Sequence, residues 1–180
     1  MKKIHLLPIL LAAASISAFG QVRSTASRLG DMQIGGGYSI AKADYLTNRI
    51  KGFNFYTDFD FKPNWGVELN FHQLNDNTGT QVYERTYEFG GRYTRRYFGI
   101  VNPYVKGLYG RGVYNYSQSQ ANLAYNMLIG GGGIDFAVHK RVNVRVDYEY
   151  QHWMSFPYSG LNPQVFTVGA AYHFGAGKPH

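Results

Sequence analysis

The chain has 180 residues, a formal net charge of +7 and an aromatic content of 17%, a length that allows one domain or two very small ones. It contains no cysteine, which excludes both a disulfide framework and a lipid anchor on a thiol. The mean hydropathy is slightly negative, and beyond the N-terminal region no segment reaches the run of about 18 apolar residues that a transmembrane helix needs, so a helical membrane protein is excluded.

The N-terminal twenty residues have the layout of a cleavable secretory signal. Lys2 and Lys3 precede an apolar run at residues 4–14, and small residues lie just before Gln21. The apolar run is too short to span a bilayer as a helix. We expect residues 1–20 to be a signal peptide and residues 21–180 to form the mature domain; a buried N-terminal helix is the alternative.

The mature chain keeps a net charge of +5. A basic balance can indicate a nucleic-acid partner, but an exported chain would not meet one. The charge fits an anionic lipid surface better.

Apolar and polar residues then alternate with a period of two, which is typical of strands. The segment 141–151 is the cleanest, with valines and tyrosines on one face and Asn143, Arg145, Asp147 and Glu149 on the other. The pattern predicts eight strands without a helix, at residues 32–41, 53–61, 65–72, 83–94, 103–116, 127–138, 141–151 and 165–174. In the fifth strand Lys106 and Arg111 have opposite parity, so one of them faces outward unless a bulge shifts the register.

The predicted connections alternate in length. Residues 62–64 and 139–141 form tight turns, and residues 95–101 form a longer one on the same side. The connections on the other side are longer and polar, and they cover residues 42–49, 74–81, 115–124 and 152–163. Short turns at one end and longer loops at the other are typical of outer-membrane barrels.

Alternation alone does not decide which face is inside, and a soluble lipocalin-like barrel would bury the aromatic face. Three features favour the opposite orientation. The apolar face is too bulky for a narrow interior, the aromatic residues gather at strand ends as in interfacial girdles, and the polar face mixes both signs of charge. The fold class that follows is all-β: an eight-stranded antiparallel transmembrane β-barrel.

The last strand carries the most specific motif. Thr167, Gly169, Tyr172 and Phe174 follow the order polar, glycine, aromatic, aromatic. In this the chain resembles the small OmpA/OmpX-like outer-membrane β-barrels, over residues 29–174. The resemblance implies that these four residues form the assembly signal read by the barrel-assembly machinery, although residues 175–180 follow where the signal usually ends the chain. It also implies a bacterial outer-membrane location, with outer-membrane lipid and lipopolysaccharide as surroundings. The family has no shared catalytic site.

The predicted interior face is rich in charge, and we expect its groups to pair across the lumen and fill it. We expect Arg145 to be the central cation, with Glu68, Glu84 or Glu88 as partners. The predicted network also contains Arg92, Asp147, Glu149, Asp58 and Asp60, with Lys106 or Arg111 as a further base.

Other motifs have simpler interpretations. Glycines 130–133 are followed by a strand and not by the helix of a phosphate loop. His72, His139, His152 and His173 lie in separate segments without metal-ligand spacing. His72 with Glu68 could be half of an acid–base pair, but an ordinary polar contact is the better interpretation.

An aromatic cluster in the last long loop contains Trp153, Met154, Phe156, Pro157 and Tyr158. We interpret it as the rim of the aromatic girdle, and an adhesive tip is the alternative.

The function predicted from these observations is a structural or surface-interacting outer-membrane barrel that is monomeric, is not an enzyme, and needs no cofactor or metal. A narrow porin-like channel is the first alternative. A lipid A-modifying enzyme is the second, although the chain lacks the His and Ser two apart on one strand that the deacylase group carries.

Overall fold

The computed structural model describes residues 30–44, 48–76, 82–95, 97, 99–115, 122–155 and 161–174. The predicted signal peptide lies outside these residues. No helix within them has the length and hydropathy that a membrane span requires.

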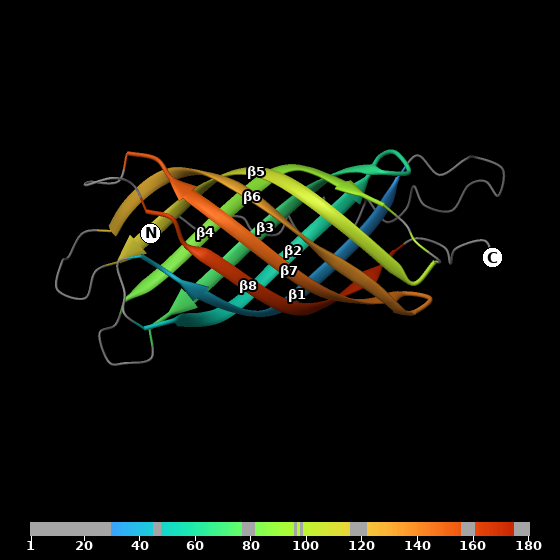
Figure 1. Cartoon of the computed structure of the whole chain (residues 1–180), viewed down its shortest axis with the longest axis horizontal. Coiled ribbons are helices and arrows are strands. Elements are labelled where there is room, and N and C mark those ends of the chain that lie inside the picture. The colour runs from blue at the N-terminus through green and yellow to red at the C-terminus, as the bar shows by residue number, and fades with distance from the viewer. Residues whose placement is uncertain are drawn as a thin grey trace, which may run out of the picture.

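Eight antiparallel strands form a closed barrel in which each strand pairs with the next and the last pairs with the first (Figure 1). The strands are β1 (Asp31–Lys42), β2 (Ile50–Asp60), β3 (Trp65–Asn75), β4 (Tyr83–Thr94), β5 (Val101–Asn115), β6 (Asn122–His139), β7 (Val142–Trp153) and β8 (Gln164–His173). The predicted fold class and number of strands are confirmed. Closure leaves no strand edge unpaired, which removes the usual route to edge-to-edge association.

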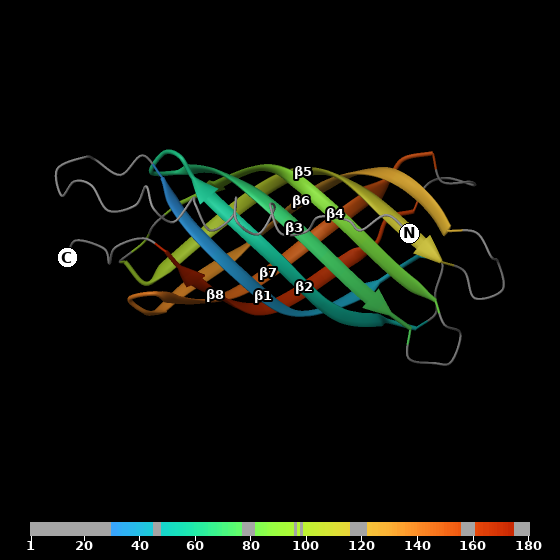
Figure 2. The same ribbon diagram turned by 180° about the vertical axis from the view of Figure 1, so that it is seen from behind.

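The two ends of the barrel differ. Both the start of β1 and the end of β8 lie at one end, where Gln33 pairs with His173 (Figures 1 and 2). The shorter connections, at residues 61–64, 95–100 and 140–141, are at this short-turn end. The other connections are at the long-loop end. Within the 95–100 turn, Gly99 has a positive φ of 68°, a conformation that glycine adopts without a steric penalty.

The largest difference from the predicted strand bounds is in β6. It begins at Asn122 and not at residue 127, because its ladder with β5 continues to the pair Asn115–Asn122. The extension contains Leu123, Ala124 and Tyr125 in a row and does not alternate, so hydrophobic patterning could not indicate it. The β5 ladders with β4 and β6 have no register shift, so Lys106 faces inward and Arg111 faces outward.

The two faces of the sheet have opposite chemistry. The outward face carries large exposed apolar side chains, among them Phe55, Leu69, Phe89, Val105, Tyr109 and Val168. The inward face carries buried polar and charged side chains. This is the reverse of a soluble barrel, and it matches a surrounding medium of lipid with a polar interior.

Candidate functional site: the barrel interior

Twelve acidic and basic side chains are buried in the part of the barrel that the structure describes, and ten of them form three connected levels along its axis. Eight of the twelve are carboxylic acids. The set comprises Asp58, Glu68, Asp76, Glu84, Glu88, Asp135, Asp147 and Glu149 with Arg92, Lys106, Arg145 and His72. Asp76 and Glu84 lie outside the three levels, toward the long-loop end. Eight of the twelve were predicted for the interior network, and Lys106 was one of two alternatives for a further base; the structure buries all nine. Asp60, which was also predicted for the interior, is half-buried at the short-turn end of β2.

The level nearest the short-turn end is built around two arginines. Arg145 donates to both carboxylate oxygens of Asp135, at 2.6 and 2.8 Å, to Asp58 at 2.5 Å and to Glu68 at 3.3 Å. Arg92 bonds Asp58 and, at 3.0 Å, Asp135. Two guanidinium groups therefore share two aspartates, which come from β2 and β6.

Aromatic rings complete the surroundings of these arginines. The guanidinium carbon of Arg145 lies 3.9 Å from the ring centroid of Tyr56 and 4.8 Å from that of Tyr104. Arg92 stacks on Tyr104 at 4.5 Å. These cation–π contacts supplement the ion pairs in a desolvated setting.

The middle level is built around Lys106, whose ammonium group has three carboxylate partners. Its Nζ lies 2.8 Å from Glu68, 2.8 Å from Asp147 and 2.7 Å from Glu149. An ammonium has three donors, so this arrangement uses all of them. Glu68 also contacts Arg145, which links this level to the arginine level.

The third level is centred on His72. Its Nε2 lies 3.3 Å from Glu149 and 3.9 Å from Glu88, and its Nδ1 lies 3.3 Å from the Ser39 hydroxyl. The amide of Asn70 bonds His72 at 2.9 Å and Glu149 at 2.8 Å. His72 therefore has two acidic neighbours, and neither of them is Glu68, the partner suggested from the sequence.

The His72 level has the chemistry of a proton-holding or cation-holding cluster. The ligand atoms of His72, Glu88 and Glu149 lie within 4.8 Å of one another, so they could surround a metal ion. Sequence spacing did not indicate this group because its members come from three strands. The Nε2 of His72 lies next to both the Glu149 carboxylate and the Asn70 amide nitrogen, so which of the two it bonds depends on the protonation of the ring.

Buried apolar side chains form two clusters at the long-loop end of the interior. One cluster contains Val82, Leu108, Tyr114, Met127, Ile129, Trp153 and Leu161. A second contains Ala41, Ile50, Leu74 and Val165. We call these two clusters the apolar cap. They lie between the three charged levels and the loops, and the buried Glu84 lies opposite two of their members, Leu74 and Tyr114.

Trp153 corrects one prediction. We interpreted it as part of an outward aromatic rim, but it is the last residue of β7, it points inward, and it is fully buried. Its indole nitrogen donates to Gln151 at 3.1 Å. Gly112 makes room for the ring, because a Cβ at that position would overlap it. Phe156, Pro157 and Tyr158 lie outside the described residues.

The structure adds one residue, Asp135, to the predicted network and changes the predicted partners of Arg145. Asp135 was missed, although both of its carboxylate oxygens accept hydrogen bonds from Arg145. The glycines of β6 obscure which of its positions face inward. Of the three partners predicted for Arg145, Glu68 contacts it, whereas Glu88 lies with His72 and bonds Thr86 at 2.7 Å. Glu84 is buried nearer the long-loop end, opposite Leu74 and Tyr114 in the β3–β4 and β4–β5 ladders.

The four residues of the suggested assembly signal lie on both faces of β8. Thr167 faces inward and bonds Ser39 at 2.7 Å, and Gly169 also faces inward, next to Gly37 of β1. Tyr172 and Phe174 are exposed on the outward face at the short-turn end, with ring centroids 5.1 Å apart.

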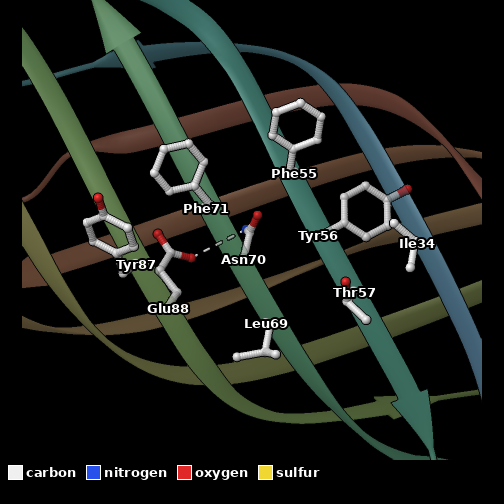
Figure 3. A pocket seen from close by; sticks show the side chains of 9 residues that line it. All are labelled: Ile34, Phe55, Tyr56, Thr57, Leu69, Asn70, Phe71, Tyr87 and Glu88. Atoms are coloured by element: carbon white, nitrogen blue, oxygen red, sulfur yellow. Dashed lines mark hydrogen bonds between the residues drawn. The ribbon is translucent and has the colours of Figure 1, made fainter. Parts of the chain in front are cut away.

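The described chain also has a shallow hollow of about 330 Å³ on its outer surface, across β1 to β4 (Figure 3). Ile34, Phe55, Leu69, Phe71 and Tyr87 surround it from the outward face. Asn70 and Glu88, which bond each other at 3.4 Å, belong to the inward face behind it. The hollow is therefore part of the apolar outer surface.

Solved structures with the same architecture are outer-membrane barrels. The Ail protein of Yersinia pestis is 20% identical and has a TM-score of 0.58, covering 82% of this chain and 100% of Ail. Neisserial surface protein A is 12% identical, with a TM-score of 0.61 and coverage of 82% and 98%. The N-terminal barrel domain of Pseudomonas aeruginosa OprF is 13% identical, with the same TM-score and the same coverage. At these identities the likeness concerns the fold. A comparison with curated proteins found no match.

A family model matches almost the whole chain, from residue 9 to residue 174. Its description is the outer membrane protein beta-barrel domain. The closed barrel, the apolar outer face and the polar interior agree with that description. The chain therefore belongs to the outer membrane protein beta-barrel domain family, and its location is the bacterial outer membrane.

Proposed function

We propose that this protein is a structural, non-catalytic barrel of the outer membrane whose interior is closed by paired charges and an apolar cap. The observation that carries the proposal is the cross-linking of strands by Arg145. From β7 it reaches Asp58 on β2, Glu68 on β3 and Asp135 on β6. Lys106 on β5 adds links to β3 and β7. The charges thus connect opposite walls instead of lining an open path.

Physical arguments support a closed interior. An eight-stranded barrel is only wide enough for side chains to fill it. Opening a path through the arginine level would separate buried ion pairs, and removing one partner of such a pair typically costs about 3–5 kcal/mol. At the long-loop end a water column would have to cross the apolar cap, and hydrophobic constrictions resist wetting.

The position of the His72 level supports a non-catalytic role. Ser39, His72 and Glu149 bring together a hydroxyl, an imidazole and a carboxylate, the groups of a nucleophilic site. All three have 0% exposure and face the interior, whereas a membrane lipid would approach the outer surface. Mass spectrometry of lipid A from cells with and without the protein tests this, because identical lipid A species are expected and a changed acyl pattern would contradict the proposal.

A narrow cation channel is the second candidate, favoured by the excess of acids inside the barrel. Among the described residues eight buried carboxylates face Arg92, Lys106, Arg145 and His72, and rings of acidic side chains are typical of cation-conducting pores. Planar-bilayer recording separates the two candidates, because a closed interior gives no stable conductance.

With the interior closed, the outer surface and the long-loop end are where the protein would act. Short turns face the periplasm in barrels of this kind, so the long-loop end would face the cell exterior. We propose outer-membrane lipid and lipopolysaccharide as its surroundings and the barrel-assembly machinery as a transient partner. The closed sheet supports a monomer, which chemical cross-linking in the membrane would test.

A further inference from the structure

The charges on the three levels of the interior do not balance. At the arginine level two guanidinium groups face two aspartates, so this level is neutral. The other two levels contain four buried carboxylates, those of Glu68, Glu88, Asp147 and Glu149. Among the described residues the permanent positive charge at these two levels is the ammonium of Lys106. Four carboxylates against one ammonium give a formal charge of −3 when the His72 ring is neutral. Buried charge needs compensation, which either protons or a further cation must supply.

Three ligand groups of the His72 level converge on one point. The Nε2 of His72 lies 3.3 Å from Oε2 of Glu149 and 3.9 Å from Oε1 of Glu88, and all three side chains have 0% exposure. The amide nitrogen of Asn70 marks the point, because it lies 2.9 Å from the imidazole, 2.8 Å from Glu149 and 3.4 Å from Glu88. Figure 3 shows the last of these contacts. An amide nitrogen has only two hydrogens for these three groups, whereas a metal ion can bind all of them.

A buried amide oxygen beside the same point has no hydrogen-bond partner among the described residues. It is Oδ1 of Asn54, which lies opposite His72 in the β2–β3 ladder and is 3% exposed. The Nδ2 of Asn54 donates to Oδ1 of Asn70 at 3.4 Å. A half-turn of both amides brings the Asn70 oxygen to the converging groups and gives the Asn54 oxygen a donor. The two amides can therefore supply a fourth ligand.

We propose that His72, Glu88 and Glu149 bind one divalent transition-metal ion of the zinc class, with the amide oxygen of Asn70 as fourth ligand. An imidazole with carboxylates is a donor set that suits zinc and its neighbours, whereas Mg²⁺ and Ca²⁺ prefer oxygen ligands alone. A divalent ion would reduce the formal charge of the two levels from −3 to −1. It would also tie together β3, β4 and β7, which carry the ligands.

The surroundings of the ligands fit this role. The Nδ1 of His72 lies 3.3 Å from the Ser39 hydroxyl, which orients the ring. Glu149 bonds Lys106 through Oε1 and faces His72 through Oε2, so one carboxylate can serve both the ammonium and the metal. Partners of this kind usually hold metal ligands in place.

The ion would enter while the barrel forms. Its ligands are fully buried and lie on three strands, two of which, β4 and β7, are not neighbours in the sheet. The ligands meet only when the strands have paired, so metal binding is coupled to folding. We therefore expect the folded barrel to retain the ion against a chelator. The inference goes beyond the structural role and does not depend on whether the lumen conducts.

The test folds the full-length protein into phosphatidylcholine vesicles in the presence of Co²⁺, which takes the same ligands as zinc. EDTA and a desalting column then remove loosely bound metal, and elemental mass spectrometry measures cobalt per protein. We expect about one retained Co²⁺ per wild-type barrel, and less than about a tenth of that in His72→Gln and in Glu88→Gln. Zn²⁺ present during folding should raise the urea midpoint of the wild type but not of these variants.

His173→Gln and Glu84→Gln are the matched controls. His173 is partly exposed beside Asp31 at the short-turn end, and Glu84 is buried outside the three levels. Both controls should retain cobalt like the wild type, and heat-modifiable migration on a gel shows that each variant is folded. A folded wild type without retained cobalt overturns the site and assigns the compensation to protons. Equal retention by the wild type and the His72 and Glu88 variants overturns it as well. A conductance in the wild type would instead count against the closed lumen and leave this result standing.

Discussion

Arg145 and Asp135 are direct partners in the β6–β7 ladder, and their inward side chains form a two-pronged ion pair at 2.6 and 2.8 Å. The same guanidinium also reaches Asp58 and Glu68 across the lumen. This one side chain therefore combines a local cross-strand pair with contacts that span the barrel.

Arg145→Ala should lower the free energy of unfolding more than other arginine substitutions. It leaves buried carboxylates without their main partner, which typically costs about 3–5 kcal/mol. Urea unfolding in phosphatidylcholine vesicles measures the loss. Arg111→Ala is the matched control, because that side chain is exposed on the outer face and should change stability by less than about 0.5 kcal/mol. Equal effects of the two substitutions would contradict the proposed network.

Asp135→Ala combined with Arg145→Ala should cost less than the sum of the two single substitutions. Removing both members of a buried pair avoids leaving one charge unpaired, and contacting residues typically couple by about 0.5–3 kcal/mol. A double-mutant cycle of unfolding free energies gives the coupling. Strict additivity would mean that the contact does not contribute to stability.

Gly112→Ala should destabilise the apolar cap. The added methyl group would overlap the buried ring of Trp153, and overpacking of this kind typically costs about 1–3 kcal/mol. Gly107→Ala, on the same strand where a Cβ meets no atom within 4 Å, is the control. The difference in urea midpoint between the two variants is the measurement, and similar midpoints would argue against tight packing around Trp153.

The positions of charges inside the barrel show what the sequence could and could not predict. Strict alternation in residues 141–151 was enough to turn Arg145 inward, because period two fixes the face of every residue in a strand. It could not identify the partners across the lumen, since these depend on the stagger of strands that are distant in the chain. Glu68 contacts both Lys106 and Arg145 and so links the middle level to the arginine level, whereas Glu88 belongs to the His72 level.

The missed residues have a different cause. In β6 glycines occupy both inward and outward positions next to Asp135, so the sequence offered no contrast between faces. The sequence pattern places Trp153 in a loop with an outward side chain, whereas in the structure β7 continues to that residue. Aromatic residues near strand ends usually suggest a girdle, and only the register shows that Trp153 has inward parity with Gln151.

Tyr172→Ala and Phe174→Ala should lower the amount of assembled barrel in the outer membrane. Both side chains belong to the motif that resembles the family's assembly signal. Phe166→Ala is the matched control, because Phe166 is exposed on the same face of β8 at the other end. Quantifying folded protein by its migration in unboiled samples gives the yield. Wild-type assembly of both variants would mean that the motif is not used as a signal in this chain.

The closed lumen is tested most directly by recording the purified wild-type protein in a planar bilayer. Because we propose that Arg145, Lys106 and the apolar cap close the interior, we expect no stable conductance steps at any applied voltage. The insertion of folded barrel is verified by heat-modifiable migration of the same preparation. Steady conductance from correctly folded wild-type protein would contradict the structural role and favour the cation channel.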